Sequence, residues 1–475
     1  MTVAAAATTS AHASEPSPVI PVLDPATGER LGEVPDETEV QAVAKVERAD
    51  RGLQEWRSVP PRRRAEVLRR CYELMVERSE DLAQLISQEN GKALVDARGE
   101  VTYAAEFFRW YSEEAVRLNG SVGRAPGGTN NILTWHEPVG VAVLVTPWNF
   151  PAAMATRKIA PALAAGCSIV LKPAAETPLT ALAIVEICRE AGVTENAVNV
   201  VTTRRSGAVV AAMLGQRPVR ALSFTGSTEV GRRLLSTAAE RVLVCSMELG
   251  GNAPFLVFDD CDLDDVLDGL MVAKMRNGGQ ACTAANRILV QRGIHDQVAT
   301  RLAERMAALK VGRGIELETE CGPLINAAAV QKVAGLVEEA QRAGADVLTG
   351  GSAPARPGSF FTPTVLTGVA ADWRVAREEI FGPVAALQVF ETEDEAIVSA
   401  NSTELGLGAY VYSGDLARGL RVAGHLESGM VAINRGLLSD PAAPFGGSKQ
   451  SGLGREGGSA GVHEFTETKY VAVDW

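Results

Sequence analysis

Between residues 139 and 260, short apolar segments rich in β-branched residues alternate with segments of helical pattern. The pattern predicts strands at 141–146, 168–171, 198–202, 221–224, 242–247 and 255–257, with helices at 157–165, 181–191 and after Ser227. Strands that are apolar throughout and joined by helices form a parallel sheet covered on both faces. Because such sheets bind ligands at the carboxyl ends of their strands, the residues that follow these strands are the first candidates for a functional site.

Folded segments are predicted on both sides of this region. Apolar residues recur every three or four positions from 62 to 89 and predict one helix that stops at Gly91. Further along, we expect Asp262 and Asn326 to cap two more helices. Residues 1–18 are rich in Ala, Ser and Thr and have no basic or long apolar stretch, so we expect a disordered tail and not a signal peptide.

Composition limits the partners and the compartment. The chain has 475 residues and a net charge of 46 − 58 = −12. The absence of any apolar run of about 18 residues argues against a membrane span, and the acidic balance argues against binding to nucleic acid or to an anionic membrane. The seven cysteines include no C-x-x-C pair and the five histidines show no metal-ligand spacing. We therefore expect a cytoplasmic protein that uses no metal and acts on a small molecule.

A phosphate-binding turn is predicted at residues 224–231, where a strand is followed by Gly226 and by Ser227, which opens a helix. Free N–H groups and the positive end of the helix dipole suit a pyrophosphate, although an ordinary strand-to-helix turn is the alternative. A G-x-G-x-x-G sequence at 452–457 follows no predicted strand, so it is rejected as a dinucleotide fingerprint.

Three residues have side chains suited to acyl chemistry. Cys282 follows an Asn-Gly-Gly-Gln turn, where a thiol can be exposed to substrate and activated by N–H groups; a small buried side chain is the commoner fate of a free cysteine. Glu248 ends a predicted strand, where it can act as a general base or be a solvated acid. Asn149 also follows a strand, and its amide can donate to an oxyanion or simply close a turn.

Together, the motifs of this chain resemble the aldehyde dehydrogenase superfamily from about residue 20 to the C-terminus. The matching segments, in that family's order, are TPWNFP (146–151), LKP (171–173), FTGS (224–227), ELGG (248–251), QAC (280–282), EIFGP (379–383) and PFGG (444–447). The resemblance implies an α/β fold of three parts that assembles into a homodimer or homotetramer. The parts are a doubly wound parallel-sheet cofactor domain (19–118 and 140–250), an α/β catalytic domain (251–447) and a β oligomerisation flap (119–139 and 463–475).

The resemblance also implies roles for single residues. Cys282 would be the nucleophile, Asn149 and the backbone N–H of Cys282 would hold the oxyanion, and Glu248 would activate the water that hydrolyses the thioester. The residues that would bind the cofactor, NADP or NAD, are Trp148, Lys172, Ala175, Gly226, Ser227, Glu379 and Phe381. Of these, Lys172 would hold the adenosine ribose, Ser227 the pyrophosphate and Glu379 the nicotinamide ribose.

Within the superfamily, the chain looks most similar to succinate-semialdehyde dehydrogenases, at residues 250–255, 276–280 and 467–471. That resemblance implies that Arg157, Arg276 and Ser439 bind the carboxylate of the substrate. A guanidinium fork matches a carboxylate, and two cations in an apolar entrance are costly without an anion. The alternative is that one or both arginines form structural ion pairs.

The chain departs from that subfamily at two positions. Arg435 stands where Glu is usual and would alter the accepted substrate length if it faces the entrance, and Ala284 excludes a second cysteine there as a redox switch. Glutarate semialdehyde is the near rival as substrate, because one methylene gives only about 1–3 kcal/mol of discrimination. A general aliphatic or aromatic aldehyde is the other alternative, if the arginines are paired elsewhere.

The expected cofactor is NADP in preference to NAD. Relatives that prefer NAD often carry Glu three residues after the ribose-binding lysine, where this chain has Ala175, with Glu176 shifted by one. Arg204 and Arg205 follow a strand near the adenosine end, and arginine is a good phosphate partner. The alternative is that both arginines are solvated and that Glu176 replaces the missing acid.

Two rivals come from other functional classes. A catalytically silent binding protein on this fold would be expected to lack Cys282 or Glu248, and both are present. An acylating enzyme that passes the acyl group to coenzyme A usually lacks the base at position 248.

Overall fold

The alternating apolar segments form one sheet of six strands in the computed structural model, which describes residues 18–475. Its strand order is β19-β9-β8-β5-β6-β7, and every neighbouring pair is parallel except β19 and β9. The strands are β5 (Val141–Val145), β6 (Ser168–Lys172), β7 (Val198–Val200), β8 (Val219–Thr225), β9 (Val244–Glu248) and β19 (Gly452–Leu453). The disordered tail expected at residues 1–18 lies outside the described residues, apart from Pro18.

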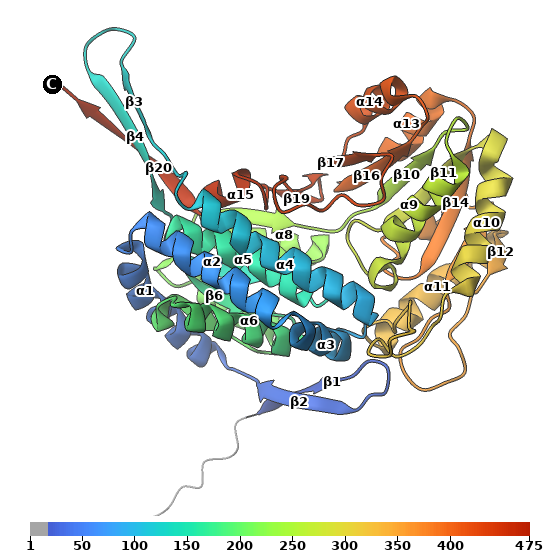
Figure 1. Ribbon diagram of the computed structural model, residues 1–475, viewed down its shortest axis with the longest axis horizontal. Coiled ribbons are helices and arrows are strands. Elements are labelled where there is room, and N and C mark those ends of the chain that lie inside the picture. The colour runs from blue at the N-terminus through green and yellow to red at the C-terminus, as the bar shows by residue number, and fades with distance from the viewer. Residues whose placement is uncertain (1–17) are drawn as a thin grey trace, which may run out of the picture.

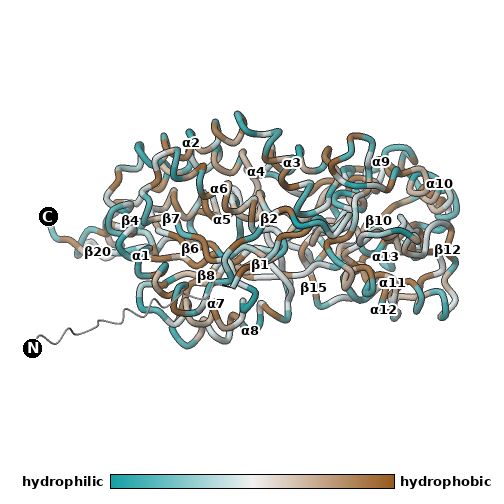
Figure 2. The backbone as a smooth tube through the Cα atoms, turned by 90° about the horizontal axis from the view of Figure 1, so that it is seen from below, coloured by the Kyte–Doolittle hydropathy of each residue, from teal (hydrophilic) through white to brown (hydrophobic). Residues whose placement is uncertain are grey.

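Helices cover both faces of this sheet, because successive residues of its central strand point to opposite sides. Ala142 and Leu144 pack into a core with α2 (Pro61–Glu77), α4 (Leu94–Glu114), α5 (Pro151–Ala165) and α6 (Pro178–Ala191). Val141, Val143 and Val145 pack into a second core with α1 (Glu39–Arg57), α7 (Ser206–Leu214) and α8 (Thr228–Ala239). Figure 2 shows the hydrophobic strands β6 and β8 between these two helical layers.

Two predicted helices have different limits in the structure. The helix expected at 62–89 is broken at Arg78, which leaves helical backbone geometry between α2 and α3 (Ser79–Asn90). The apolar spacing could not reveal this break, because the buried pair at 74–75 is followed by another at 82–83, close to two helical turns later. The helix expected from residue 157 begins at Pro151, a residue suited to the first turn.

A second sheet of seven strands lies beside the first, and the two occupy opposite halves of an arch (Figure 1). Its order is β12-β13-β14-β11-β10-β16-β17, parallel except at β12. The strands are β10 (Ala253–Val257), β11 (Ala285–Gln291), β12 (Asp346–Thr349), β13 (Thr364–Thr367), β14 (Val384–Phe390), β16 (Gly408–Tyr412) and β17 (Met430–Ile433). The strand predicted at 255–257 therefore belongs to this sheet and does not close the first one.

Helices also cover the second sheet. They are α9 (Leu263–Met275), α10 (His295–Ala308), α11 (Ala327–Ala343), α12 (Arg374–Arg377), α13 (Glu393–Asn401) and α14 (Leu416–His425). The predicted caps are confirmed: Asp262 accepts from two backbone N–H groups at the start of α9, and Asn326 accepts from one at the start of α11. The chain crosses between the two sheets at residues 249–252, immediately after β9.

The remaining strands form three small sheets. The antiparallel sheet of β3 (Ser121–Arg124), β4 (Asn131–Pro138) and β20 (Thr466–Val473) projects from the body at the C-terminus (Figure 1). The others pair β1 (Val19–Leu23) with β2 (Arg30–Pro35), and β15 (Leu405–Gly406) with β18 (Ser448–Lys449). A short helix, α15 (Ala460–His463), precedes β20. Within residues 18–475, no helix combines the length and apolar character needed to span a membrane.

A buried arginine, which has no carboxylate partner among residues 18–475, ties the second sheet to one of its helices. Arg287, on β11, donates to the carbonyl oxygens of Asn252, Ser399 (2.7 Å) and Ala400 (2.8 Å), the last two in the final turn of α13. Burial lowers its pKa to about 10. The guanidinium thus satisfies carbonyl groups that a helix end leaves without donors.

We expect Arg287→Met to lower the thermal midpoint by several degrees, because each buried carbonyl left without a donor costs about 1–3 kcal/mol. Differential scanning calorimetry measures this shift. The matched control is Arg292→Met, which removes an exposed ion pair with Glu391 and should move the midpoint by less than about 1 °C. Equal shifts in the two variants would show that the Arg287 contacts do not stabilise the fold.

Candidate active site

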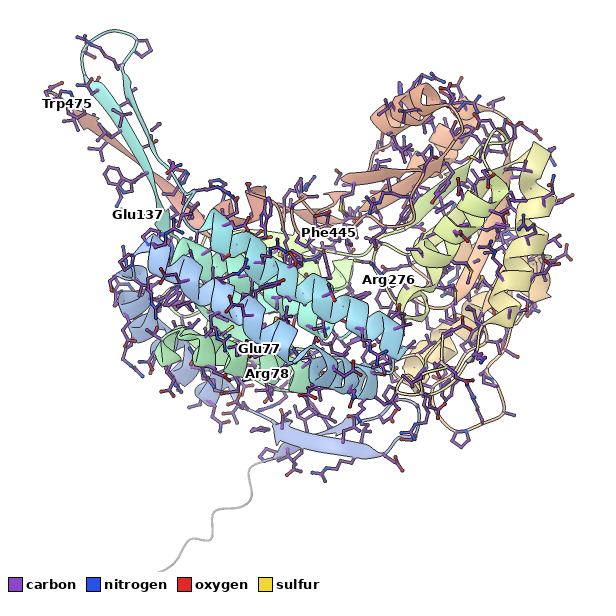
Figure 3. The ribbon with its side chains drawn as sticks, in the orientation of Figure 1. Glu77, Arg78, Glu137, Arg276, Phe445 and Trp475 are labelled. Atoms are coloured by element: carbon purple, nitrogen blue, oxygen red, sulfur yellow. The ribbon has the colours of Figure 1, made fainter. Side chains whose placement is uncertain are left out.

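Cys282 lies between two cavities. One has a volume of about 240 Å³ and the other of about 310 Å³, and both are lined by Cys282, Phe150 and Met154. The thiol is half-buried, and the residues before it end α9 and enter a tight turn at Arg276–Gly279. Figure 3 labels Arg276 where the two halves of the molecule face each other.

The turn before Cys282 is buried, whereas the sequence predicted an exposed turn. Asn277 has a left-handed backbone (φ 53°), and Gly279 (φ 76°) lies so close to the carbonyl oxygen of Gly382 that a Cβ would approach it to 2.2 Å. The Gln280 side chain donates to the Asn277 carbonyl and accepts from Ile325 N–H (3.0 Å). The backbone that carries the thiol is therefore fixed by the side-chain amide of Gln280, a residue that the sequence analysis took only as part of a turn.

Asn149 is tied to this turn by hydrogen bonds. Its Nδ2 donates to the carbonyl oxygen of Gln280 (3.1 Å), and its Oδ1 is buried with no partner in the described part of the chain. Its own carbonyl oxygen accepts from Lys92 Nζ (2.7 Å) and Asn277 Nδ2 (2.8 Å). The second hydrogen of the Asn149 amide is thus left for a ligand in the 310 Å³ cavity that Asn149 lines with Cys282.

Lys92 and Glu100, which sequence reasoning missed, form a fully buried ion pair (2.5 Å) beneath Asn149. The other Glu100 oxygen accepts from the N–H groups of Ala152 (2.8 Å) and Ala153 (3.2 Å), at the start of α5. That helix has no side-chain cap from its own N-cap residue, so Glu100 supplies the missing acceptor. Nothing in the local sequence around residues 92 and 100 predicts their contacts with Asn149 and Ala152, because these partners lie more than fifty positions away along the chain.

Burial raises the pKa of the Cys282 thiol to about 12. The nearby charges oppose one another: Arg157 and Arg276 lower this pKa, whereas Glu379 and Glu248 raise it. The thiol is accordingly protonated at neutral pH in this state, which differs from the activated thiol expected from the sequence.

Glu248 ends β9 and lies in a buried cluster of charges. Both of its carboxylate oxygens are without a hydrogen-bond partner among the described residues. Burial, together with the nearby Glu456 carboxylate, raises its pKa well above the ordinary value. Burial opposes ionisation of Glu456 as well, but Lys158 and Arg157 outweigh it and lower the pKa of that carboxyl. Within this cluster, Glu456 is therefore the more readily ionised carboxyl group and Glu248 the more readily protonated one.

The 240 Å³ cavity brings together all three residues expected to bind a carboxylate. Arg157, Arg276 and Ser439 line it, together with Cys282. Tyr103, which sequence reasoning missed, also lines it, and its buried hydroxyl has no partner in the described residues. Arg435 is exposed and does not line this cavity, so it gives no support to an altered substrate length.

The seven residues expected to bind the cofactor line two adjoining cavities at the carboxyl edge of the first sheet. Lys172 and Ala175 line a groove of about 650 Å³, while Trp148, Glu379 and Phe381 line the 310 Å³ cavity. Gly226 and Ser227 line both, so the two spaces meet at the start of α8, where the Ser227 hydroxyl accepts from Val230 N–H.

The donors and acceptors of these cavities fit a dinucleotide. Free N–H groups at the start of α8 suit a pyrophosphate. Glu379 is an acceptor suited to ribose hydroxyls; one of its oxygens accepts from Gly251 N–H (3.3 Å), and burial raises its pKa to about 7. The rings of Trp148 and Phe381 meet edge to face, with centroids 5.4 Å apart. The G-x-G-x-x-G sequence has a structural role instead. Its first glycine, Gly452, begins β19 and lies so close to β9 that a Cβ would be 2.1 Å from the carbonyl oxygen of Met247.

A half-buried thiol beside a dinucleotide-shaped groove, at the carboxyl edge of a doubly wound sheet, defines an enzyme that oxidises a carbonyl compound through a covalent adduct. Among the described residues, no group of three or more His, Cys, Asp or Glu side chains could hold a metal ion. The chain belongs to the aldehyde dehydrogenase family, whose model matches residues 12–471.

Individual relatives agree with this assignment. The chain is 51% identical to a succinate-semialdehyde dehydrogenase of Paenarthrobacter nicotinovorans, over 92% of this chain and 97% of the relative. It is 48% identical to a glutarate-semialdehyde dehydrogenase of Pseudomonas putida, over 96% and 94%. The crystal structure of an NADP-dependent enzyme from E. coli superposes with a TM-score of 0.95 at 46% identity, covering 96% of this chain and 95% of that one. The predicted family, fold class and nicotinamide chemistry are confirmed.

The raised pKa of Cys282 predicts how the thiol reacts. Because only the thiolate is alkylated, we expect the rate of Cys282 modification by iodoacetamide, without cofactor, to rise about tenfold per pH unit from about pH 7 to about pH 10. Mass spectrometry of the peptide that contains Cys282 measures this rate. The variant Glu248→Gln removes a carboxylate that raises this pKa, so it should react faster than wild type at every pH at which Glu248 is ionised. A plateau below about pH 9 would contradict the prediction.

Proposed function

We propose that this enzyme oxidises succinate semialdehyde to succinate with NADP or NAD, through a thioester on Cys282. The observation that supports the proposal most directly is one cavity lined by Arg276, Arg157, Ser439 and the thiol-bearing Cys282. A four-carbon aldehyde with a distal carboxylate matches a cavity whose lining holds both a nucleophile and cations. The relative at 51% identity is named for the same substrate.

In the first step, the thiolate of Cys282 attacks the aldehyde carbon and gives a tetrahedral oxyanion. The free hydrogen of the Asn149 amide and the backbone N–H of Cys282 stabilise this charge where it develops. Since Asn149 is already held by Gln280, Lys92 and Asn277, its donor needs little reorganisation during the reaction.

The residues that would hold the cofactor are Lys172 at the adenosine ribose, Gly226 and Ser227 at the pyrophosphate, and Glu379 at the nicotinamide ribose, with Trp148 and Phe381 as walls. When bound, the cofactor supplies a hydride acceptor at its nicotinamide ring. The side chain of Ala175 leaves the adenosine end open beside Arg204 and Ser206, which line the same groove.

In the last step, Glu248 takes a proton from water as the water attacks the thioester. Burial and the nearby Glu456 carboxylate raise the pKa of Glu248 above its ordinary value, which makes its carboxylate a stronger base than an ordinary glutamate. Such catalysis contributes about 10²–10⁴-fold. Glu248 also has no competing hydrogen bond in the described residues, which leaves both of its oxygens available to the water.

Glutarate semialdehyde is the second candidate substrate, supported by the relative at 48% identity that is named for it. The two aldehydes differ by one methylene, and they would use the same cations and the same thiol. A general aliphatic aldehyde is the third possibility, and it requires Arg276 to contribute nothing to substrate binding.

The assembly and the division into domains follow from the same proposal. We infer three parts, with a cofactor domain at 19–118 and 140–250, a catalytic domain at 251–447 and a flap at 119–139 and 463–475. The exposed edge strands β3 and β20 of the three-stranded sheet suit pairing between subunits, since an unpaired edge invites another strand. We therefore expect a homodimer or homotetramer.

Arg276→Ala tests the substrate assignment. We expect wild-type kcat/KM for succinate semialdehyde to exceed that for butyraldehyde by about 10²-fold or more, and the variant to lose most of this preference while butyraldehyde changes little. Arg276→Lys is the matched variant, since it keeps the charge without the fork and should retain part of the preference. If wild type accepts butyraldehyde equally well, or the variant slows both aldehydes alike, the carboxylate assignment is wrong and the family assignment stands.

Arg204→Ala tests the cofactor preference, for which we propose NADP. Arg204 lines the adenosine groove, whereas Arg205 lies outside it and pairs with Glu39 at the surface. We expect Arg204→Ala to raise the KM for NADP about tenfold and to leave the KM for NAD unchanged, because only NADP carries a 2′-phosphate. Arg205→Ala is the control and should change neither constant. An equal effect of Arg204→Ala on both cofactors would remove the phosphate-binding role.

A further inference from the structure

Arg157 is paired with a buried carboxylate although it lines the substrate cavity. Its Nε lies 2.5 Å from Oε2 of Glu456, and the two side chains are 1% and 5% exposed. Its Nη2 contacts Met154 Sδ (3.2 Å), and its guanidinium lies over the Phe445 ring, 4.1 Å from the centroid. The other oxygen of Glu456 accepts from Lys158 Nζ and from Ser223 Oγ (3.2 Å).

Arg276 is placed differently in the same cavity. Within residues 18–475 it forms no ion pair, is half-buried and lies over Phe150, 5.1 Å from the ring centroid. Two acids line the cavity with it: Asp96 accepts through Oδ2 from the backbone N–H of Asn277 (2.8 Å), and Glu100 pairs with Lys92. The two arginines therefore differ in pairing: Arg157 already has an anionic partner, and Arg276 has none among the described residues.

We propose that Glu456 is a specificity-determining residue that acts through Arg157. By pairing with Arg157 it limits how strongly that cation attracts the substrate carboxylate, so Arg276 carries most of the recognition. The inference rests on the proposed function, since it concerns the carboxylated end of the substrate.

Electrostatics gives the reason. Two carboxylates that share one guanidinium repel each other, and water is too scarce in a buried site to screen that repulsion. Glu456 cannot turn away, because Lys158 and Ser223 hold its second oxygen. A substrate carboxylate at Arg157 therefore meets a partly neutralised cation. If the Glu456 charge is removed, Arg157 becomes a free cation and attracts the substrate anion more strongly.

The test is the ratio of kcat/KM for succinate semialdehyde to that for butyraldehyde in the full-length enzyme. We expect Glu456→Gln to raise this ratio by at least about fivefold, through a lower KM for the carboxylated aldehyde only. Effects of Glu456 on Glu248 act on both aldehydes and cancel in the ratio. Ser223→Ala is the matched control: it removes a neutral contact of the same carboxylate but leaves the Arg157 pair, so the ratio should stay within about twofold.

A double-mutant cycle separates this role from a structural one. In an Arg157→Met background, Glu456→Gln should no longer raise the ratio, because the cation through which it acts is gone. If Glu456→Gln does not fold, Glu456→Asp keeps the charge but shortens its reach to Arg157 and should raise the ratio by a smaller factor.

The outcomes are distinct. An unchanged or lower ratio in the Glu456 variants, or an equal rise with and without Arg157, overturns the inference while the proposed function stands. A wild-type ratio near one overturns the proposed function and this inference with it. A rise that depends on Arg157 and is absent in Ser223→Ala supports both.

Discussion

The buried ion pair between Lys92 and Glu100 positions the backbone on both sides of the Asn149 side chain, a proposed catalytic group. Lys92 uses its remaining donors on the Asn149 carbonyl, and Glu100 uses its remaining oxygen on the first N–H groups of α5. Asn277, from the second half of the molecule, donates to the same carbonyl. The side chain of Asn149 and the turn that carries Cys282, which we propose as oxyanion donor and nucleophile, are thus fixed to one another across the junction of the two sheets. Such a pair adds little net stability, because desolvation of two charges offsets their attraction; its effect here is on position.

Charged side chains of both signs lie near Cys282 and shift the pKa of its thiol in opposite directions. Two arginines, Arg157 and Arg276, lower the pKa of the thiol, and two carboxyl groups, Glu379 and Glu248, raise it. One of these carboxyl groups, Glu379, has a pKa raised to about 7 by burial. Burial also lowers the pKa of the nearby Lys274 amine to about 7. The charges of Glu379 and Lys274 therefore affect each other's pKa, since neither group is screened by bulk water.

The sequence pattern predicted the strands and helix caps that depend on interactions between residues close together in the chain. The apolar runs gave the strands of the first sheet, and the caps at Asp262 and Asn326 follow from side-chain chemistry within three residues. The pattern could not show that the strand at 255–257 leaves that sheet, because the change occurs in a four-residue crossing at 249–252 that contains two glycines. The motifs led to Cys282, Asn149 and Glu248, each at or after a strand end or turn, but Glu100 and Glu456 carry no such signal. Their partners come from elements 52 and 298 positions away, and only the folded chain brings them together.

The two arginines of the substrate cavity show why the choice between a ligand role and a structural role could not be made from sequence. Both alternatives are present at once: Arg276 has no ion pair in residues 18–475, and Arg157 pairs with Glu456. A buried cation needs a counter-charge whether or not substrate is bound, because an unpaired buried charge costs several kcal/mol. A fully buried Arg157 must therefore carry its own anion, whereas a half-buried Arg276 can rely on solvent until an anion arrives. The depth of each side chain, which no linear pattern encodes, decides which of the two can offer its full charge to a substrate.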